Sequence, residues 1–390
     1  MTTENRWLLP EGIDELLPER AAQLESLRRR LLDQCAAWGY RYVVPPLVEF
    51  TDSLLVGLGA DLDVVTCKFT DQMSGRMLGV RADITPQTAR MDAHSLAEDG
   101  VTRLCYAGST LQSTPQSVVS GRAPIQLGAE LYGSDCIEAD GEVITLMLSM
   151  FEAAGVTRHL TLDIGHIGIY DALFSDAGLD ADLEAQIFDA LQRKSAPDIE
   201  RLAGSLSTEV ASKLLTLSSL HGSPDVIGAA RAALGGEAVM GDALDELEAA
   251  LEHVRLAYPD VDVYIDLTEL RGFRYHTGLV FAVYLEGRGS AVAKGGRYDN
   301  IGAVFGRDRP ATGFAVDLKA LIDDAVTQQS EELPVIVPPS NEPALREAIA
   351  ALRAAGRVVV VDVPPGVALP EAERLVQREG QWVTERETAS

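Results

Sequence analysis

The sequence predicts an α+β protein in which helices flank an antiparallel sheet. Short strand-like segments are joined by turns and hairpins, without the regular helical crossovers of a doubly wound parallel sheet. A long block rich in Ala, Leu and Glu divides these segments into two groups, as a helical insertion would. A shorter α/β pattern follows a polar stretch at residues 328–332. The length of 390 residues therefore accommodates two or three domains.

The first element is an amphipathic helix over residues 19–38. Leu24, Leu27, Leu31 and Cys35 recur at helical spacing across it, with Pro18 before its first turn and a glycine directly after it. Further elements are expected in the first half of the chain: strands over 40–44, 77–80, 103–107 and 125–132, a helix over 138–154, and a strand over 159–164.

The second half begins with residues 170–258, which we predict to be helical throughout and to form the insertion. The sheet resumes with strands expected over 261–267, 279–285, 290–294 and 312–317, a hairpin turn at Gly287-Arg288-Gly289, and a helix from Leu318. Residues 1–325 would form the main domain. The segment 333–390 predicts a strand, a helix, a second strand over 357–363 and a short final helix, too little to bury both faces of a sheet alone.

Composition excludes several classes of protein. A net charge of -26, from 59 acidic and 33 basic residues, disfavours a large nucleic-acid surface. The four cysteines form no C-x-x-C pair and the six histidines no H-E-x-x-H pair, so neither a metal site nor a disulfide framework is expected. There is no phosphate-binding G-x-x-x-x-G-K-[ST] loop and we expect no cofactor. Without a signal pattern or an apolar run of about 20 residues, we expect no membrane association and a cytoplasmic location.

Candidate binding residues occur in two early segments. In Arg81-Ala82-Asp83-Ile84-Thr85, a carboxylate and a hydroxyl can hold an ammonium group through charge-assisted hydrogen bonds, although the segment alone also fits an exposed strand end. Gln126 and Glu130 lie four residues apart on a predicted strand, so their side chains share one face. A lone glutamate on a strand is more often solvated.

Three further segments complete the pattern: 271–278, read Arg-Gly-Phe-Arg-Tyr-His-Thr-Gly; 294–299, read Lys-Gly-Gly-Arg-Tyr-Asp; and 313–320, read Gly-Phe-Ala-Val-Asp-Leu-Lys-Ala. Together the segments resemble histidyl-tRNA synthetases, which are class II aminoacyl-tRNA synthetases, over about residues 8–325. Among relatives of these enzymes, the chain resembles the regulatory subunits of ATP phosphoribosyltransferase. The resemblance implies a class II synthetase-like fold for residues 1–325, with residues 333–390 as a truncated remnant of an anticodon-binding domain.

The resemblance also implies a pocket for histidine. Asp83 and Thr85 would hold its ammonium group, Gln126 its main-chain end and Glu130 its imidazole ring. Within the segment 271–278, the resemblance implies that Arg271 binds the carboxylate, that Tyr275 lines the ring pocket, and that His276 replaces a second tyrosine; Arg274 stands where these synthetases have aspartate.

The positions that would bind ATP differ most from the synthetases. Where these enzymes read Phe-Arg-x-Glu, the chain has Gln112 for the arginine and Thr114 for the glutamate, and Ala320 replaces a second arginine. Those arginines meet the charge that develops on the α-phosphoryl group, so adenylation is predicted to be lost.

The resemblance therefore implies a non-catalytic regulatory subunit, required for the activity of the short catalytic subunit of ATP phosphoribosyltransferase and for feedback by histidine. It implies a self-dimer within a hetero-oligomer, and no tRNA as partner. Two alternatives remain open. One is a divergent histidyl-tRNA synthetase that uses Arg122, Arg274 or Lys319 as substitute cations; the other is an amino-acid-sensing module for another target.

Overall fold

The computed structural model describes residues 7–55, 63–115, 121–174, 177–234, 238–269, 276–326, 333–362 and 372–386. The chain divides into two compact units, Met1–Val326 and Thr327–Ser390, and each has a hydrophobic core of its own. Within the described residues, none of the helices combines the length and the apolar character that a bilayer span requires.

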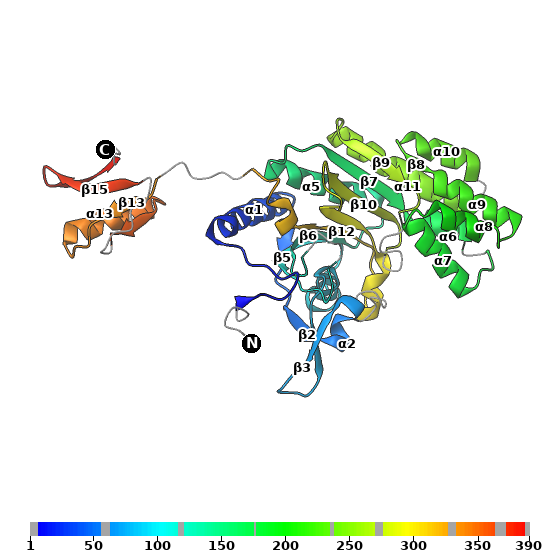
Figure 1. Cartoon of the computed structure of the whole chain (residues 1–390), viewed down its shortest axis with the longest axis horizontal. Helices are drawn as coiled ribbons and strands as arrows, with labels where there is room; N and C mark the ends of the chain where they lie inside the picture. Colours follow the sequence, from blue (N-terminus) through cyan, green and yellow to red (C-terminus); the bar gives the residue numbers. More distant parts are fainter. Residues whose placement is uncertain are drawn as a thin grey trace. The chain divides into compact units, whose positions relative to one another are not determined.

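A nine-stranded sheet forms the centre of the first unit (Figure 1). In spatial order its strands are β1 (Arg41–Tyr42), β5 (Thr102–Ser109), β6 (Ile125–Tyr132), β12 (Ala311–Asp317), β11 (Ala293–Arg297), β10 (Leu279–Leu285), β7 (Leu160–His166), β9 (Asp262–Asp266) and β8 (His221–Gly222). Neighbouring strands are antiparallel except for the pairs β1–β5 and β7–β9. The predicted α+β class is thus confirmed, and the sheet is antiparallel with a parallel pair toward each edge.

Two long helices, α1 (Pro18–Ala37) and α5 (Ile137–Ala154), cover one face of this sheet. Leu27 and Leu31 of α1 are buried in the same core cluster as Leu127 and Leu131 of β6. Because side chains alternate along a strand, the polar positions 126 and 130 of β6 lie on the opposite face. The helix predicted over residues 19–38 is confirmed, and the sheet face away from it is left for the candidate site.

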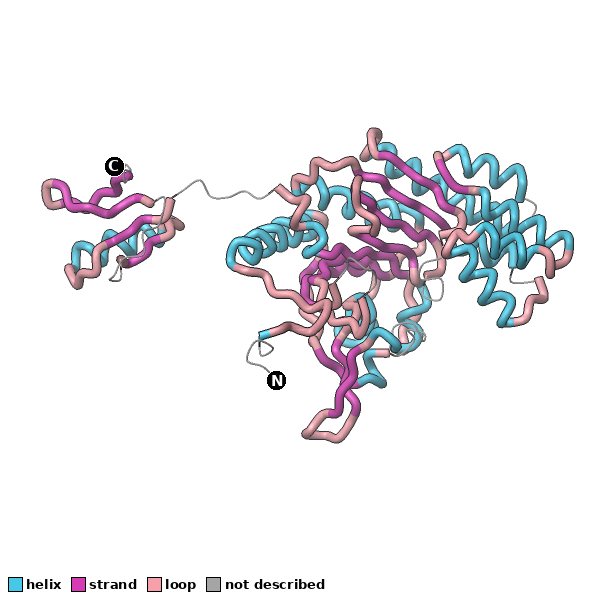
Figure 2. The backbone as a smooth tube through the Cα atoms, in the orientation of Figure 1, coloured by secondary structure: helices cyan, strands magenta, loops and turns pink. Residues whose placement is uncertain are grey.

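The insertion is a group of helices at one end of the sheet (Figures 1 and 2). Its elements are α6 (Ile167–Phe174), α7 (Ala181–Gln192), α8 (Ala196–Ala203), α9 (Thr208–Ser219), α10 (Asp225–Leu234) and α11 (Ala238–Ala257). The prediction of helix throughout 170–258 was wrong at His221 and Gly222. These two residues pair antiparallel with Asp266 and Ile265, so the end of the main sheet captures the loop between two helices as an edge strand.

A smaller sheet and several short helices lie next to the other face. The sheet has the order β2 (Val48–Phe50), β4 (Met77–Val80), β3 (Cys67–Thr70). The short helices on this side are α2 (Thr51–Leu54), α4 (Thr85–Arg90), the π-helix η2 (Met91–Leu96) and the 3-10 helix η3 (Asp299–Phe305). A further short helix, α12 (Leu318–Leu321), packs on the α1 side of the main sheet. A buried ion pair, Arg309 Nη1 to Asp92 Oδ1 at 2.8 Å, fastens η2 to the segment before β12.

The second unit is a four-stranded sheet with one helix, in the order β14 (Val359–Val361), β13 (Val335–Val337), β15 (Glu373–Arg378), β16 (Gln381–Arg386), with α13 (Pro343–Ala354). Leu345 of α13 packs against Val335, Val337 and Leu375. The short final helix was wrong over the described residues 373–386, which form a hairpin instead. Glu379 and Gly380 both have positive φ, 49° and 81°, as a two-residue hairpin turn of type I′ requires.

Candidate functional site

The candidate site lies on the face of the main sheet opposite α1 and α5, around the centre of β6. Glu130 stands directly opposite Leu104 of β5 and Gly313 of β12, while Gln126 stands opposite Gly108 and Asp317. Facing positions on neighbouring strands point the same way. Residues from three strands therefore converge with α4, which begins at Thr85 beside this face.

Glu130 is fully buried, with none of its surface exposed. The Tyr106 hydroxyl donates to its Oε1 at 2.9 Å, and the Tyr298 hydroxyl donates to its Oε2. Thr85 extends the chain of contacts, because its Oγ1 lies 3.0 Å from the Tyr106 hydroxyl. The predicted residues Thr85 and Glu130 are thus brought together through a tyrosine that the sequence had not singled out.

Burial in this position raises the pKa of Glu130 from 4.5 to about 8. Desolvation is the largest cause, and the hydrogen bonds from Tyr298, Tyr106 and Thr85 offset only part of it. The carboxyl group consequently changes its charge close to neutral pH, where it can act as a hydrogen-bond donor or as an anion toward a polar ring.

Asp83 and Gln126 form the second half of the site. Gln126 Nε2 donates to Asp83 Oδ1 at 2.8 Å, and Gln126 Oε1 accepts from the backbone N–H of Ile84 at 2.9 Å. Asp83 Oδ1 also accepts from the backbone N–H of Thr85 at 3.1 Å. The four predicted residues of these two segments therefore form one connected network across β6 and the start of α4.

Glycines make room for this network. A Cβ on Gly313 would collide with the Glu130 carboxylate and would lie 2.8 Å from the carbonyl oxygen of Ala129. A Cβ on Gly128 would overlap the Tyr106 hydroxyl. The Gly313 of the sequence pattern is thus explained by the close approach of Glu130 to the backbone.

His276 lies on the same face, because a Cβ on Gly296 would meet its ring at 2.6 Å and Gly296 stands opposite Gly313. The sheet thus places His276 two strands from Glu130. Arg271 and Tyr275 lie outside the described residues, so their predicted roles stay predictions.

The positions of the missing arginines lie at the other end of β6. Gln112 is buried and pairs with Thr66 in an isolated bridge, Thr114 is exposed, and Ala320 lies in the short helix α12. Burial raises the pKa of Asp317, which accepts from the backbone N–H of Lys319. A half-buried carboxyl thus stands at the base of α12, three residues before the position of the second missing arginine.

Two of the three candidate replacement cations are already engaged. Arg122 Nε donates to the carbonyl oxygen of Gln112 at 2.9 Å, and Lys319 Nζ donates to Asp14 Oδ1 at 2.7 Å. The third, Arg274, lies outside the described residues. Arg122 and Lys319 therefore both contact the N-terminal segment, through the Glu11 carbonyl oxygen and the Asp14 side chain.

Three carboxylates that could hold a metal ion, those of Asp163, Asp266 and Glu269, lie within 4.8 Å of one another near the insertion. Lys194 Nζ lies 2.5 Å from Asp266 Oδ2. The Lys194 ammonium group already supplies the positive charge that a metal ion would bring to these carboxylates. The geometry therefore favours an ion pair between the insertion and β9 over a metal site.

A buried ion pair connects the candidate site to the far layer of the unit. Arg297 Nη2 lies 2.6 Å from Asp140 Oδ2 of α5, and both side chains are buried. Arg297 directly precedes Tyr298, which donates to Glu130. A shift of α5 would therefore displace Arg297 and, with it, Tyr298, which orients the Glu130 carboxyl group.

Comparison with known proteins places this architecture in a family. A histidyl-tRNA synthetase family model matches residues 12–321, and a model for the ATP phosphoribosyltransferase subunit HisZ C-terminal domain matches residues 333–385. An ATP phosphoribosyltransferase regulatory subunit from Marinobacter nauticus is 47% identical over 392 residues, which cover 99% of both chains. The chain belongs to the ATP phosphoribosyltransferase regulatory subunit family. A member of that family from Thioalkalivibrio sulfidiphilus is 50% identical over 365 residues, 92% of each chain.

Solved structures agree with this assignment. A Bacillus halodurans protein described as an ATP phosphoribosyltransferase regulatory subunit/histidyl-tRNA synthetase superposes with a TM-score of 0.82 at 29% identity, covering 93% of this chain and 94% of that one. Histidyl-tRNA synthetase from Nostoc sp. PCC 7120 shares the fold, with a TM-score of 0.75 at 17% identity over 93% and 87% of the two chains. The resemblance predicted from the sequence is confirmed.

Proposed function

We propose that this chain is a non-catalytic regulatory subunit of ATP phosphoribosyltransferase, required for the activity of the short catalytic subunit and for inhibition by histidine in the first step of histidine biosynthesis. The observation that carries the proposal is the 47% identity, over 99% of both chains, to a regulatory subunit of that enzyme. The assembly would be cytoplasmic.

The absence of aminoacylation is part of the proposal. Loss of one fixed donor to a developing charge costs roughly 2.7 to 4 kcal/mol of transition-state stabilisation in other enzymes. Gln112 and Ala320 replace two such donors, while Arg122 and Lys319 are held by the N-terminal segment. We therefore expect no histidine-dependent exchange of pyrophosphate into ATP.

Histidine is the proposed effector, and the network around Glu130 is its proposed site. Asp83 and Thr85 would meet the ammonium group, Gln126 the main-chain end, and Glu130 the ring, with Arg271, Tyr275 and His276 closing the pocket. The pKa of about 8 at Glu130 supports this role, because its carboxyl group is able either to accept from an imidazole N–H or to donate to a ring nitrogen.

A self-dimer within the hetero-oligomer is expected through α1 and the edge strand β1. Tyr42 and Val44 at this edge are 47% and 72% exposed, and an edge strand with exposed apolar side chains favours association. The net charge of -26 supports a partner other than tRNA.

The test is to mix the purified short catalytic subunit with this chain and to measure its turnover at increasing histidine concentration. We expect turnover to rise on addition of the chain and to fall again with histidine. Unchanged turnover together with unchanged inhibition by histidine would reject the proposal, and a control with the catalytic subunit alone separates the two effects.

A further inference from the structure

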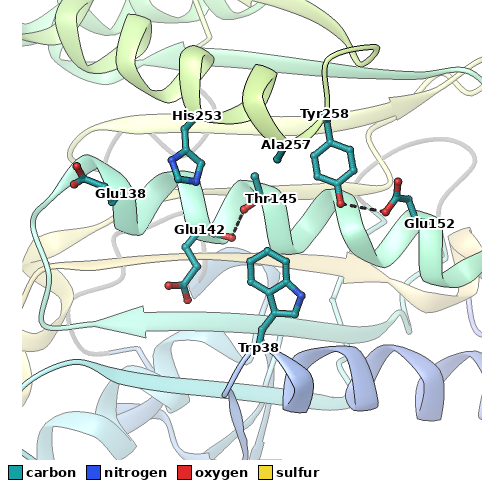
Figure 3. A pocket seen from close by; sticks show the side chains of 8 residues that line it. All are labelled: Trp38, Glu138, Glu142, Thr145, Glu152, His253, Ala257 and Tyr258. Atoms are coloured by element: carbon teal, nitrogen blue, oxygen red, sulfur yellow. Dashed lines mark hydrogen bonds between the residues drawn. The ribbon is translucent and has the colours of Figure 1, made fainter.

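A groove on the outer surface of α5, here named the α5 groove, lies apart from the candidate site. It has a volume of about 540 Å³, and among its lining residues are Trp38, Glu138, Glu142, Glu152, His253 and Tyr258 (Figure 3). The floor is the side of α5 that faces away from the sheet, and the walls come from the C-terminal ends of α1 and α11. The layer formed by α1 and α5 separates it from the face that holds Glu130.

The lining of the α5 groove is suited to a positively charged ligand. Three carboxylates line it; the described residues contribute no lysine or arginine to its lining, and His253 is the lining side chain that can itself become positively charged. Glu142 is already compensated, because Arg103 donates to both of its oxygens at 2.7 Å. Glu138 and Glu152 are exposed, and neither forms an ion pair within the described part of the chain; Glu152 accepts only from the Tyr258 hydroxyl, at 3.2 Å.

Two other features of the α5 groove favour a cation. The rings of Trp38 and Tyr258 stand over α5 (Figure 3), and aromatic faces attract ammonium and guanidinium groups. The helices α1 and α11 end at Ala37 and Ala257 beside the groove, and the carbonyl groups at a helix C-terminus carry partial negative charge. The carboxylates, the rings and the C-terminal ends of α1 and α11 therefore favour a cation, against the opposing partial positive charge of the α5 N-terminus at Glu138.

The length of the α5 groove indicates a peptide segment. Glu138 and Glu152 mark its two ends on one helix, and at 1.5 Å per residue they lie roughly 21 Å apart along the axis. About six extended residues cover that distance. A free amino acid spans much less of it.

We propose that the α5 groove is a docking surface for an arginine- or lysine-bearing segment of the ATP phosphoribosyltransferase catalytic subunit. This inference rests on the proposed function, because it takes that subunit as the partner. Basic side chains of the segment meet Glu138 and Glu152, and one guanidinium or ammonium group lies against the Trp38 ring.

The test compares the affinity of the catalytic subunit for three forms of the full-length chain, by isothermal titration calorimetry at two salt concentrations. The groove variant is E138R/E152R. Its control, E200R/E252R, makes the same change of charge at exposed glutamates of α8 and α11 that do not line the groove. Reversal of both groove charges is expected to raise Kd by about tenfold or more, and the control to stay within about twofold of wild type. Thermal unfolding and near-UV circular dichroism check that the variants fold.

The outcomes separate the inference from the proposed function. If the catalytic subunit binds wild type and the groove variant equally well, the docking surface is wrong while the proposed function stands. If the catalytic subunit does not bind wild type, both are wrong. A titration with free L-arginine forms a further arm: arginine binding that E138R/E152R abolishes, with partner affinity unchanged, would overturn docking in favour of a small cation.

Discussion

The buried carboxyl group of Glu130 makes the stability of the protein depend on pH in a direction that the structure fixes. Its pKa is raised from 4.5 to about 8 on folding, chiefly by desolvation. Below pH 4.5 both states hold the proton, and between pH 4.5 and 8 only the folded state keeps it. Stability therefore falls as pH rises through this window, by about 1.4 kcal/mol per pH unit and roughly 5 kcal/mol in all.

Glu130→Gln removes this titration while it preserves the shape of the neutral acid. The amide still accepts a hydrogen bond from one tyrosine, and the other hydroxyl is able to rotate and accept from the new NH₂ group. We expect the variant to match wild type near pH 5 and to exceed it by several kcal/mol at pH 8.

The assay is urea unfolding of both proteins at half-unit steps from pH 5 to 9, with Glu200→Gln on the surface of α8 as the control. The difference between variant and wild type isolates Glu130, because every other titrating group is common to both. Parallel stability curves for wild type and Glu130→Gln would refute the assignment of a raised pKa to this residue.

Two further substitutions test the packing around the site and the end of the first unit. Gly313→Ala should destabilise the protein by about 1 to 3 kcal/mol and abolish histidine binding, because the added Cβ collides with Glu130. The control Gly228→Ala should be tolerated, because the space around Gly228 is open. Equal unfolding midpoints for the two variants would contradict this reading. Asp324→Ala removes the buried carboxylate that Arg158 and Arg288 share. Because both arginines reach solvent, the free energy of unfolding should fall by about 1 to 3 kcal/mol, and an unchanged value by chemical denaturation would contradict a stabilising role for these ion pairs.

Local patterns sufficed for the parts of the fold that depend on one segment. The spacing of Leu27, Leu31 and Cys35 predicted α1, and the alternation along β6 placed Gln126 and Glu130 on one face. The prediction of a final helix is wrong because the strand–helix–strand pattern before it favours another helix, and Glu379-Gly380 is not among the usual sequences of a two-residue hairpin turn.

The hydrogen-bond partners of the site residues could not be predicted, because they lie far from those residues in the sequence. Tyr106 and Tyr298 bond Glu130 from 24 and 168 residues away, and Arg309 reaches Asp92 across 217 residues. Tyr298 belongs to the segment 294–299 of the sequence pattern, but the sequence alone assigns no role to its hydroxyl group. Which of these side chains meet depends on the order of the strands and on the segments that connect them.

The measurement that tests the central claim most directly is a calorimetric titration of histidine into this chain, alone and with the catalytic subunit, with the catalytic subunit alone as control. A retained amino-acid site coupled to the partner predicts that histidine binds this chain and that its Kd changes when the catalytic subunit is present. An absence of binding to the chain in both conditions would contradict the account.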